Sequence, residues 1–241
     1  MMQDWKDRTH LLLKDKLSIL ENAHVLVVGL GGVGAYTAEM LCRAGIGTFT
    51  LIDADTVDCT NRNRQLPALI STEGKLKTEV MQERLLDINS EVKLHIFSEF
   101  LRDERIAEVL DMHRYDYVVD AIDSLSPKTF LIVETLKRNI PLVSAMGAGG
   151  KIDPSKVKVA DISKTEQCPL ASYIRKRLRK MGITTGFKAV FSTEEQMPNA
   201  NRDDIVSEFK RTTVGTIAYM PAIFGCWCAS VCIRDLMVKR L

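Results

Sequence analysis

A run of amide and guanidinium side chains follows a short apolar segment, in residues 53–65 (DADTVDCTNRNRQ). Asn61, Arg64 and Gln65 belong to this run, and the ammonium of Lys77 comes a loop later. Side chains of these types can neutralise the charge that develops on phosphates when a nucleoside triphosphate is cleaved. The spacing therefore predicts a triphosphate site, with ordinary solvated charges as the alternative interpretation of Arg64 and Lys77.

A glycine-rich turn, GLGGVG in residues 29–34, precedes that run. Gly29, Gly31 and Gly34 fit the G-x-G-x-x-G pattern between an apolar run and a helical pattern, and Asp53 ends the next apolar run. Such glycines let the main chain approach a phosphate at a helix N-terminus, and the acidic residue can accept hydrogen bonds from ribose. We predict a nucleotide site here; the alternative is that the glycines only ease a close contact between strand and helix.

The glycine turn alone does not distinguish ATP from a nicotinamide dinucleotide. A dinucleotide mainly needs main-chain amides and a helix dipole at its pyrophosphate, whereas triphosphate cleavage needs cations on the departing phosphates. Arg64 and Lys77 supply such cations. The sequence therefore favours ATP over a nicotinamide-dependent oxidoreductase.

Short apolar runs alternate with helical patterns along the chain, which indicates where these side chains are held. The predicted strands are HVLVV before the glycine turn and residues 48–53, 93–97, 115–121, 140–145, 156–162 and 186–192. Near-continuous apolar strands alternating with helices are typical of a parallel sheet covered on both faces. We predict an α/β fold with a Rossmann-like, doubly wound, mostly parallel sheet, helices on both faces and a C-terminal strand and helix extension.

The chain length of 241 residues suits one domain with a single core. We expect one unit over residues 1–241, with a nucleotide-binding core in 8–150, which begins with an amphipathic helix in 8–20. Residues 151–241 are predicted to face the substrate and to pack a dimer. Within them, the polar stretch 193–213 is predicted to be a flexible loop.

The motifs GLGGVG, LIDADTVDCTNRNRQ, GKLKTE and AIDS occur in that order within residues 8–150. This arrangement resembles the ubiquitin-activating-like family of carboxylate adenylating enzymes, which includes the activators of sulfur carriers in molybdopterin and thiazole synthesis. The resemblance implies ATP and Mg²⁺ as cofactors and an acyl adenylate as intermediate. The nucleotide-binding residues that it implies are Gly29, Gly31, Gly34, Asp53, Asp55, Asn61, Arg64, Gln65 and Lys77.

The same resemblance implies catalytic roles for Arg64, Lys77, Asp123 and Arg8. Asp123 would hold Mg²⁺, which suits a carboxylate at the carboxyl end of a strand where the sheet order should reverse; a helix N-cap is the alternative. In relatives, an arginine near Arg8 reaches the ATP site of the other subunit, which implies a homodimer. A surface arginine is the alternative interpretation.

The six cysteines show no disulfide framework, and the N-terminal segment shows no leader pattern, so we expect reduced thiols and a cytoplasmic protein. Cys226 and Cys228 are spaced C-x-C without a second pair, so no structural zinc is expected. Cys168 has polar neighbours that would permit reactivity, although a small residue at a helix start is the alternative.

The second half of the chain contains GAGGKIDPSKV, DISKTEQCPLASYIRKRLRK and AYMPAIFGCW. These segments resemble the bacterial tRNA threonylcarbamoyladenosine dehydratases, a branch of the same family. The resemblance implies ATP-dependent dehydration, by cyclisation, of threonylcarbamoyladenosine in tRNA, with a sulfur-relay protein as a further partner. The alternative is an adenylyltransferase that activates the C-terminal carboxylate of a ubiquitin-like sulfur-carrier protein.

Two stretches bear on partners. The net charge of +2 neither demands nor excludes nucleic acid, but one predicted helix carries the cations Arg175, Lys176, Arg177, Arg179 and Lys180. This helix is predicted to bind tRNA phosphates, with a solvated helix face as the alternative.

The stretch between Arg211 and Arg234 is uncharged and long enough on paper to cross a bilayer. We favour a buried helix over membrane association at the C-terminus.

Overall fold

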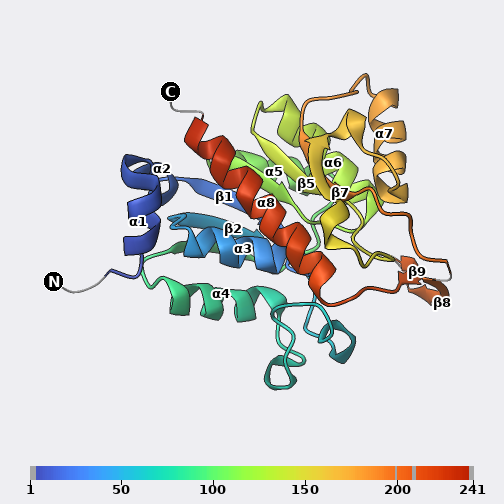
Figure 1. Cartoon of the computed structure of the whole chain (residues 1–241), viewed down its shortest axis with the longest axis horizontal. Coiled ribbons are helices and arrows are strands. Elements are labelled where there is room, and N and C mark those ends of the chain that lie inside the picture. Colours follow the sequence, from blue (N-terminus) through green and yellow to red (C-terminus); the bar gives the residue numbers. More distant parts are fainter. Residues whose placement is uncertain (1–3, 199, 208–209, 239–241) are drawn as a thin grey trace.

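The computed structural model describes residues 4–198, 200–207 and 210–238. The strands are β1 (His24–Val28), β2 (Thr48–Ile52), β3 (Lys93–Phe97), β4 (Tyr117–Asp120), β5 (Leu142–Ala145), β6 (Val157–Asp161), β7 (Lys188–Ser192), β8 (Asn201–Ser207) and β9 (Lys210–Val214). The helices are α1 (Asp7–Leu13), α2 (Leu17–Glu21), α3 (Gly34–Arg43), α4 (Lys77–Ile88), α5 (Glu104–Met112), α6 (Leu125–Lys137), α7 (Pro169–Lys180) and α8 (Tyr219–Val238). Figure 1 shows their arrangement.

Strands β1 to β7 form a seven-stranded sheet in the order β3-β2-β1-β4-β5-β7-β6. All neighbouring pairs are parallel except β6 and β7, which are antiparallel. The strand order reverses between β1 and β4, so the crevice at the carboxyl ends of these strands is the expected ligand site of an open α/β sheet. The predicted doubly wound, mostly parallel fold is confirmed.

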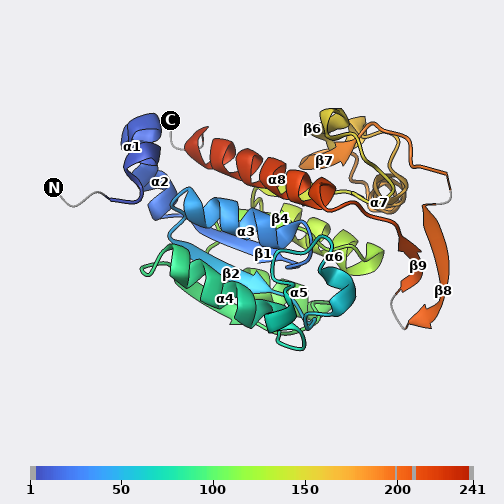
Figure 2. The ribbon, with the colours of Figure 1, turned by 60° about the horizontal axis from the view of Figure 1, so that its bottom comes forward.

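Alternate residues of β1 show how both faces of the sheet are covered. Val25 and Val27 pack in a core with residues of α3, α4 and α8, whereas Leu26 and Val28 pack in a second core with residues of α5, α6 and α7. Figure 2 shows α8 lying along α3 over the sheet. Burial on two faces explains why the strands appear in the sequence as continuous apolar runs.

Two expected elements differ from the structure. The predicted helix in 8–20 is interrupted at Lys14, whose φ of +51° ends α1 before a short 3₁₀ turn and α2. The predicted loop in 193–213 is corrected: it contains the antiparallel hairpin of β8 and β9, with residues 199, 208 and 209 outside the described part. Main-chain hydrogen bonds can hold such a ribbon without apolar alternation, so its strands carry no hydrophobic pattern in the sequence.

Histidines gather at the amino-terminal edge of the sheet, beneath the connection from α5 to β4. The ring centroids of His24 and His95 are 5.3 Å apart, those of His24 and His113 are 5.2 Å apart, and those of His95 and His113 are 4.3 Å apart. Nε2 of His24 lies 2.9 Å from Oγ1 of Thr50. Burial, together with charge on His113 and His95, lowers the pKa of His24 to about 4, while Asp116 acts in the opposite direction.

We expect the fold to lose stability on acidification through His24. The folded pKa is about 4, below the unfolded value, so protons bind preferentially to the unfolded chain as pH falls from about 7 to 4. The contribution is present above this window and lost within it; allowing for residual solvent screening, it is about 2 kcal/mol. Urea unfolding at about pH 7 and at about pH 4 measures this: the free energy of unfolding should fall less between these pH values in His24→Gln than in wild type. His10→Gln, on exposed α1, is the control and should match wild type.

Candidate nucleotide site

The glycine-rich turn after β1 is pressed against the exit of β4. A Cβ on Gly34 would lie 1.7 Å from the carbonyl oxygen of Gly29, and a Cβ on Gly29 would lie 2.8 Å from the carbonyl oxygen of Ala121. Gly29 also has φ +91°, which favours glycine. By contrast, only the amide group of Gln65 approaches Gly31, at 3.8 Å from the position of a Cβ. The turn therefore needs glycine for packing at its ends and leaves room beside the main chain at Gly31.

Asp53, at the end of β2, ties the turn to the next strand. Its carboxylate accepts the Leu30 N–H at 2.6 Å and the Asp55 N–H at 2.8 Å. Burial raises the pKa of Asp53, and the charge of Lys77 and the two amides oppose that shift. A carboxylate has about four acceptor positions, so these two bonds leave capacity for ribose hydroxyls.

The polar run folds into a compact turn beside the glycines. The side chain of Asp58 accepts the Thr60 N–H at 2.8 Å and caps a short 3₁₀ helix, Cys59–Asn61, while Oδ1 of Asn61 accepts the Asp58 N–H at 3.3 Å. Nη1 of Arg64 donates to the Thr60 carbonyl at 3.0 Å. A Cβ on Gly32 would lie 3.3 Å from the Arg64 carbonyl oxygen. The run and the glycine turn, which the sequence predicted to share a ligand, are thus in contact.

The side chain of Gln65 leaves a hydrogen-bond acceptor beside the glycine turn, where a polar ligand could bind. Its Oε1 is buried and, in the part of the chain that the structure describes, has no hydrogen-bond partner. Leaving a buried acceptor unpaired costs about 1–3 kcal/mol. Because the same amide group faces Gly31, a hydroxyl or amino group of a bound nucleotide would satisfy it. The residues present therefore fit ATP.

Lys77, the first residue of α4, is held at the same edge of the sheet. The residue is 3% exposed, and its Nζ lies 2.6 Å from Oδ2 of Asp55, whose carboxylate is exposed. Its main-chain N–H also donates to the Asp55 carbonyl at 3.0 Å. The ammonium is therefore fixed in position near Asp53 and Asp55 before any ligand binds.

Asp123 lies in the connection between β4 and α6. The N-cap position of α6 is occupied by Ser124, so Asp123 is exposed one residue earlier and is not the cap. No group of three His, Cys, Asp or Glu side chains in the described ranges is placed to hold a metal ion. A single carboxylate nevertheless suits Mg²⁺, which commonly binds one or two carboxylates together with substrate phosphates. The assignment of Asp123 as a Mg²⁺ ligand stays a prediction.

A buried ion pair braces this connection, and the sequence analysis missed it. Asp120 and Lys128 are both 0% exposed, with Nζ and Oδ2 2.9 Å apart. Nζ of Lys128 also donates to the Ile122 carbonyl at 2.8 Å, and Oγ of Ser144 donates to Asp120 at 2.6 Å. A lysine within the apolar segment SPKTFLIV was the available signal, since a buried lysine needs a partner.

The structure separates the other predicted site residues from this cluster. Arg8 is an exposed residue of α1, and Figure 1 shows α1 beside α2, near the start of β1. The glycine turn follows the other end of β1. On α7 the cations Lys176, Arg177, Arg179 and Lys180 are exposed. Arg175 is half-buried and donates to the Thr165 carbonyl at 2.9 Å, so it is the least available of the five for an external phosphate.

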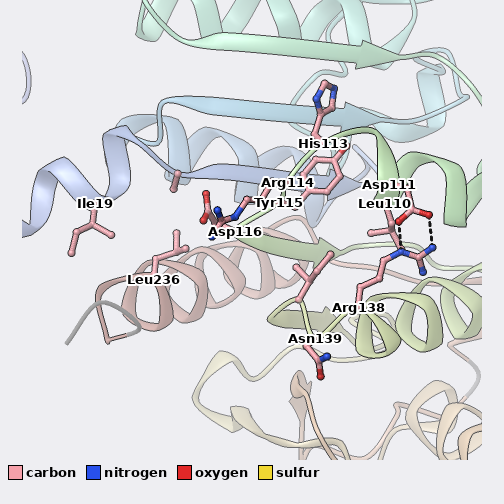
Figure 3. A pocket seen from close by; sticks show the side chains of 12 residues that line it. Ile19, Leu110, Asp111, His113, Arg114, Tyr115, Asp116, Arg138, Asn139 and Leu236 are labelled. Carbon is pink, nitrogen blue, oxygen red and sulfur yellow. Dashed lines mark hydrogen bonds and ion pairs between the residues drawn. The ribbon is translucent and has the colours of Figure 1, made fainter.

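A cavity of about 700 Å³ also lies away from the nucleotide site, and Figure 3 shows the side chains that line it. It lies at the amino-terminal edge of the sheet, beside Arg114 and Tyr115 before β4 and Asn139 before β5. Arg138 on its wall is neutralised by Asp111, with paired contacts of 2.7 Å. Because ligands of open α/β sheets bind at the carboxyl ends of the strands, we do not assign the nucleotide to this cavity.

Helix α8 has the length and mean hydropathy (1.4) of a membrane span, but 44% of that apolar window is buried in the fold. A Cβ on Gly225 would lie 2.6 Å from the Val33 carbonyl oxygen, and Oγ1 of Thr37 donates to the Gly225 carbonyl at 3.2 Å. At the other end, the hydroxyl of Tyr117 donates to Asp235 at 2.8 Å. The helix is therefore packed against α3 and the sheet.

Comparison with known proteins places the chain in a family. The model of the ThiF family matches residues 8–239. The chain belongs to the ThiF family. The tRNA threonylcarbamoyladenosine dehydratase of Bacillus subtilis (strain 168) is 40% identical to this chain over 241 residues, covering 95% of this chain and 94% of that protein. Molybdopterin-synthase adenylyltransferase of Escherichia coli (strain K12) is 33% identical, but over 54% of this chain and 51% of that protein.

A solved ThiF-like structure agrees with the sequence comparison. The crystal structure of E. coli tRNA N6-threonylcarbamoyladenosine dehydratase, TcdA, in complex with ATP superposes with a TM-score of 0.89 at 38% identity. The match covers 99% of this chain and 98% of that chain. The expected resemblance to the dehydratase branch is thus confirmed over the full length, including the extension after residue 150.

Proposed function

We propose that this ThiF-family chain is an ATP-dependent enzyme that dehydrates threonylcarbamoyladenosine in tRNA through adenylation of a carboxylate. The observation that carries the proposal is similarity along the whole chain to dehydratases so named, one of which was crystallised with ATP. The geometry supports it because the glycine turn, the amide oxygen of Gln65, which has no partner among the described residues, and the buried Lys77 lie at one edge of the sheet. ATP is therefore the nucleotide that we assign to this edge.

The proposed reaction has two steps. An oxygen of the threonyl carboxylate attacks the α-phosphorus of ATP, and pyrophosphate leaves as the acyl adenylate forms. A nucleophilic atom of the neighbouring carbamoyl group then attacks the activated carbonyl, loses its proton and displaces AMP, so that the ring closes and the nucleoside loses one water. Arg64 and Lys77 stabilise charge on the departing phosphates, and tethering of the reacting groups favours closure. Bound at Asp123, Mg²⁺ would neutralise phosphate charge.

Exposed cations on α7 support tRNA as the macromolecular substrate. Lys176, Arg177, Arg179 and Lys180 present positive charge along the helix, and Nη1 of Arg177 donates to Oγ of Ser126 at 2.8 Å, at the start of α6. The helix is therefore connected to the segment that follows Asp123. Binding through phosphate contacts should weaken steeply as salt concentration rises.

A homodimer completes the proposed active site. Helix α1, which carries Arg8, lies away from the glycine turn of its own chain, so Arg8 would serve catalysis only by entering the site of a second copy (Figure 1).

A sulfur-relay protein is the further partner that we propose for the assembly, and the cytoplasm is the proposed location. The packing of α8 against α3 supports its assignment as a core helix rather than a membrane anchor.

Activation of a sulfur-carrier protein is the second candidate function. It is favoured by the partial similarity to molybdopterin-synthase adenylyltransferase, which spans 54% of this chain. Pyrophosphate exchange would then require a carrier protein ending in Gly-Gly rather than modified tRNA. Comparing exchange with each substrate separates the two functions.

Replacement of Asp123 by asparagine should raise the Mg²⁺ concentration needed for half-maximal turnover by about 10- to 100-fold, because a neutral amide oxygen binds the cation more weakly. ATP binding in the absence of Mg²⁺ should be unchanged. The measurement is a Mg²⁺ titration of initial rates. Asp87→Asn on the exposed face of α4 is the matched control and should leave the titration curve in place; coincident curves for the two variants would contradict the assignment of Asp123.

The experiment that tests the function is mass analysis of nucleosides from tRNA incubated with the protein, ATP and Mg²⁺. We expect threonylcarbamoyladenosine to lose the mass of one water, with AMP formed in equal amount. An unchanged nucleoside, with protein that binds ATP, would overturn the proposal.

A further inference from the structure

A second, smaller depression lies at the start of α7, on the same edge of the sheet as the glycine turn. Its volume is about 340 Å³, within the usual range for small-ligand pockets of about 300–1,000 Å³. Its lining residues are Gln167, Cys168, Pro169, Ser172, Arg175 and Gln196. They follow β6 and β7 and face the connection that leaves β5.

Main-chain contacts connect this depression with the polar run. A Cβ on Gly147, just after β5, would lie 3.6 Å from Sγ of Cys168, and a Cβ on Gly149 would lie 3.3 Å from Oγ1 of Thr216. The carbonyl of Thr216 in turn accepts a hydrogen bond from Nδ2 of Asn63 at 2.9 Å. The residues 147–149 therefore bridge the depression and the segment that carries Arg64.

A buried ammonium holds the walls of the depression together. Lys151 is 3% exposed, and its Nζ donates to the carbonyls of Gln167 at 3.2 Å, Ser192 at 3.3 Å and Glu194. The carboxylate of Glu194 accepts the Ile152 N–H at 3.0 Å. Gln167 has φ +49°, a conformation that costs free energy for a non-glycine residue, and its carbonyl is one of those held by Lys151. The walls are thus organised before a ligand binds.

The chemistry of the lining limits what can bind. Gln167 and Gln196 supply amides that both donate and accept hydrogen bonds, and Ser172 supplies a hydroxyl. Arg175, whose Nη1 is bonded to the Thr165 carbonyl, contributes positive charge, and the lining residues include no carboxylate. Such a surface disfavours a positively charged ligand. It suits a ligand that has both hydrogen-bond donors and acceptors and that carries negative charge beside them. A nucleobase extended by a carbamoyl group, flanked by backbone phosphates, has those properties.

We propose that the depression formed by Gln167, Ser172, Arg175 and Gln196 receives the modified adenosine of the tRNA, turned out of the anticodon loop, and determines recognition of the modification. This inference rests on the proposed function. Lys151 is a positioning residue, since it acts through the main chain of Gln167 and Glu194. The nucleoside enters on one side of residues 147–149 and ATP on the other, which brings its carboxylate toward the α-phosphate.

The test compares wild type with a double variant that carries both Gln167→Ala and Ser172→Ala. Gln167 is exposed and Ser172 half-buried, so their truncation should leave thermal unfolding unchanged. We expect KM for tRNA carrying threonylcarbamoyladenosine to rise about tenfold, because hydrogen bonds to the substrate are lost, with KM for ATP unchanged. Binding of the same tRNA without the modification should not change. Gln82→Ala, on α4, is the matched control and should behave as wild type.

Other outcomes separate this inference from the proposed function. Equal weakening of modified and unmodified tRNA in the double variant, as expected for Lys180→Ala, would show a phosphate surface only and overturn the pocket assignment. Wild-type turnover with no effect of the double variant would also overturn it. If wild type fails to convert modified tRNA, the proposed function is wrong. The pocket assignment is then still tested by comparing how tightly wild type and the double variant bind modified tRNA. Selective loss of binding of a peptide ending in Gly-Gly would assign the pocket to a protein C-terminus instead.

Discussion

Replacing Lys77 with methionine is expected to lower kcat/KM about 10²- to 10³-fold, the effect typical of removing one preorganised charge-stabilising group. The same change should leave the free energy of unfolding equal to that of wild type or raise it. Lys77 is 3% exposed, so its charge is costly to bury, whereas its partner Asp55 is exposed and stays hydrated when the ammonium is removed. Loss of activity without loss of stability is the signature of a residue retained for function.

The measurement pairs steady-state kinetics with urea unfolding on the same preparations. Asp55→Asn breaks the ion pair but keeps the ammonium, so it should reduce kcat/KM less than Lys77→Met does. If Lys77→Met instead lowers stability and activity together, and Asp55→Asn does the same, the lysine is a structural element of α4. That outcome would falsify its assignment to the phosphates.

Replacing Gly34 with alanine is expected to destabilise the fold by about 4 kcal/mol or more, the range reached by severe steric mechanisms. The added methyl group would lie 1.7 Å from the carbonyl oxygen of Gly29, and neither atom belongs to a flexible side chain. The turn and α3 would have to separate, which also removes the main-chain amides from the nucleotide site. Thermal and urea unfolding measure the loss.

Gly31→Ala is the matched control for the stability of the same turn. At Gly31 the added methyl group meets only the amide group of Gln65, at 3.8 Å, so stability should change by less than about 1 kcal/mol. ATP affinity should nevertheless fall, because the methyl group lies where the phosphate approaches the main chain. Equal stability of the two variants would show that the turn relaxes and that the steric argument is wrong.

The strands before and after the glycine turn were predictable because burial on both faces leaves a strong apolar signal. The runs predicted at 48–53, 93–97 and 140–145 correspond to β2, β3 and β5 within a residue or two at each end. The order of the strands required the crossover rules of α/β sheets, and the antiparallel direction of β6 carried no sequence signal. The hairpin of β8 and β9 was missed because polar side chains hide a ladder made of main-chain groups.

The proximity of the polar run to the glycine turn was predictable from chemistry and spacing, whereas contacts that depend on packing were not. The side chain of Gln65 and the carbonyl of Arg64 lie beside the glycine turn, and Lys77 contacts Asp55, because the carboxyl ends of β1 and β2 meet there. Asn61 bonds instead within its own turn. The brace between Asp120 and Lys128 was not predicted, since it joins residues whose partnership appears only once β4 and α6 pack. Similarly, the charge of Arg175 gave no indication that its guanidinium turns toward Thr165.

The packing of α8 has a consequence for where the molecule can work. Gly225 touches the main chain at Val33, and a Cβ on Gly32 would lie 2.9 Å from Cβ of Pro221, so the first turns of this helix form the outer wall of the glycine turn. If α8 moved into lipid, its contacts with Gly32 and Val33 would be lost, and the glycine turn would no longer be packed against this helix. We therefore expect that insertion of α8 into a bilayer would abolish nucleotide binding.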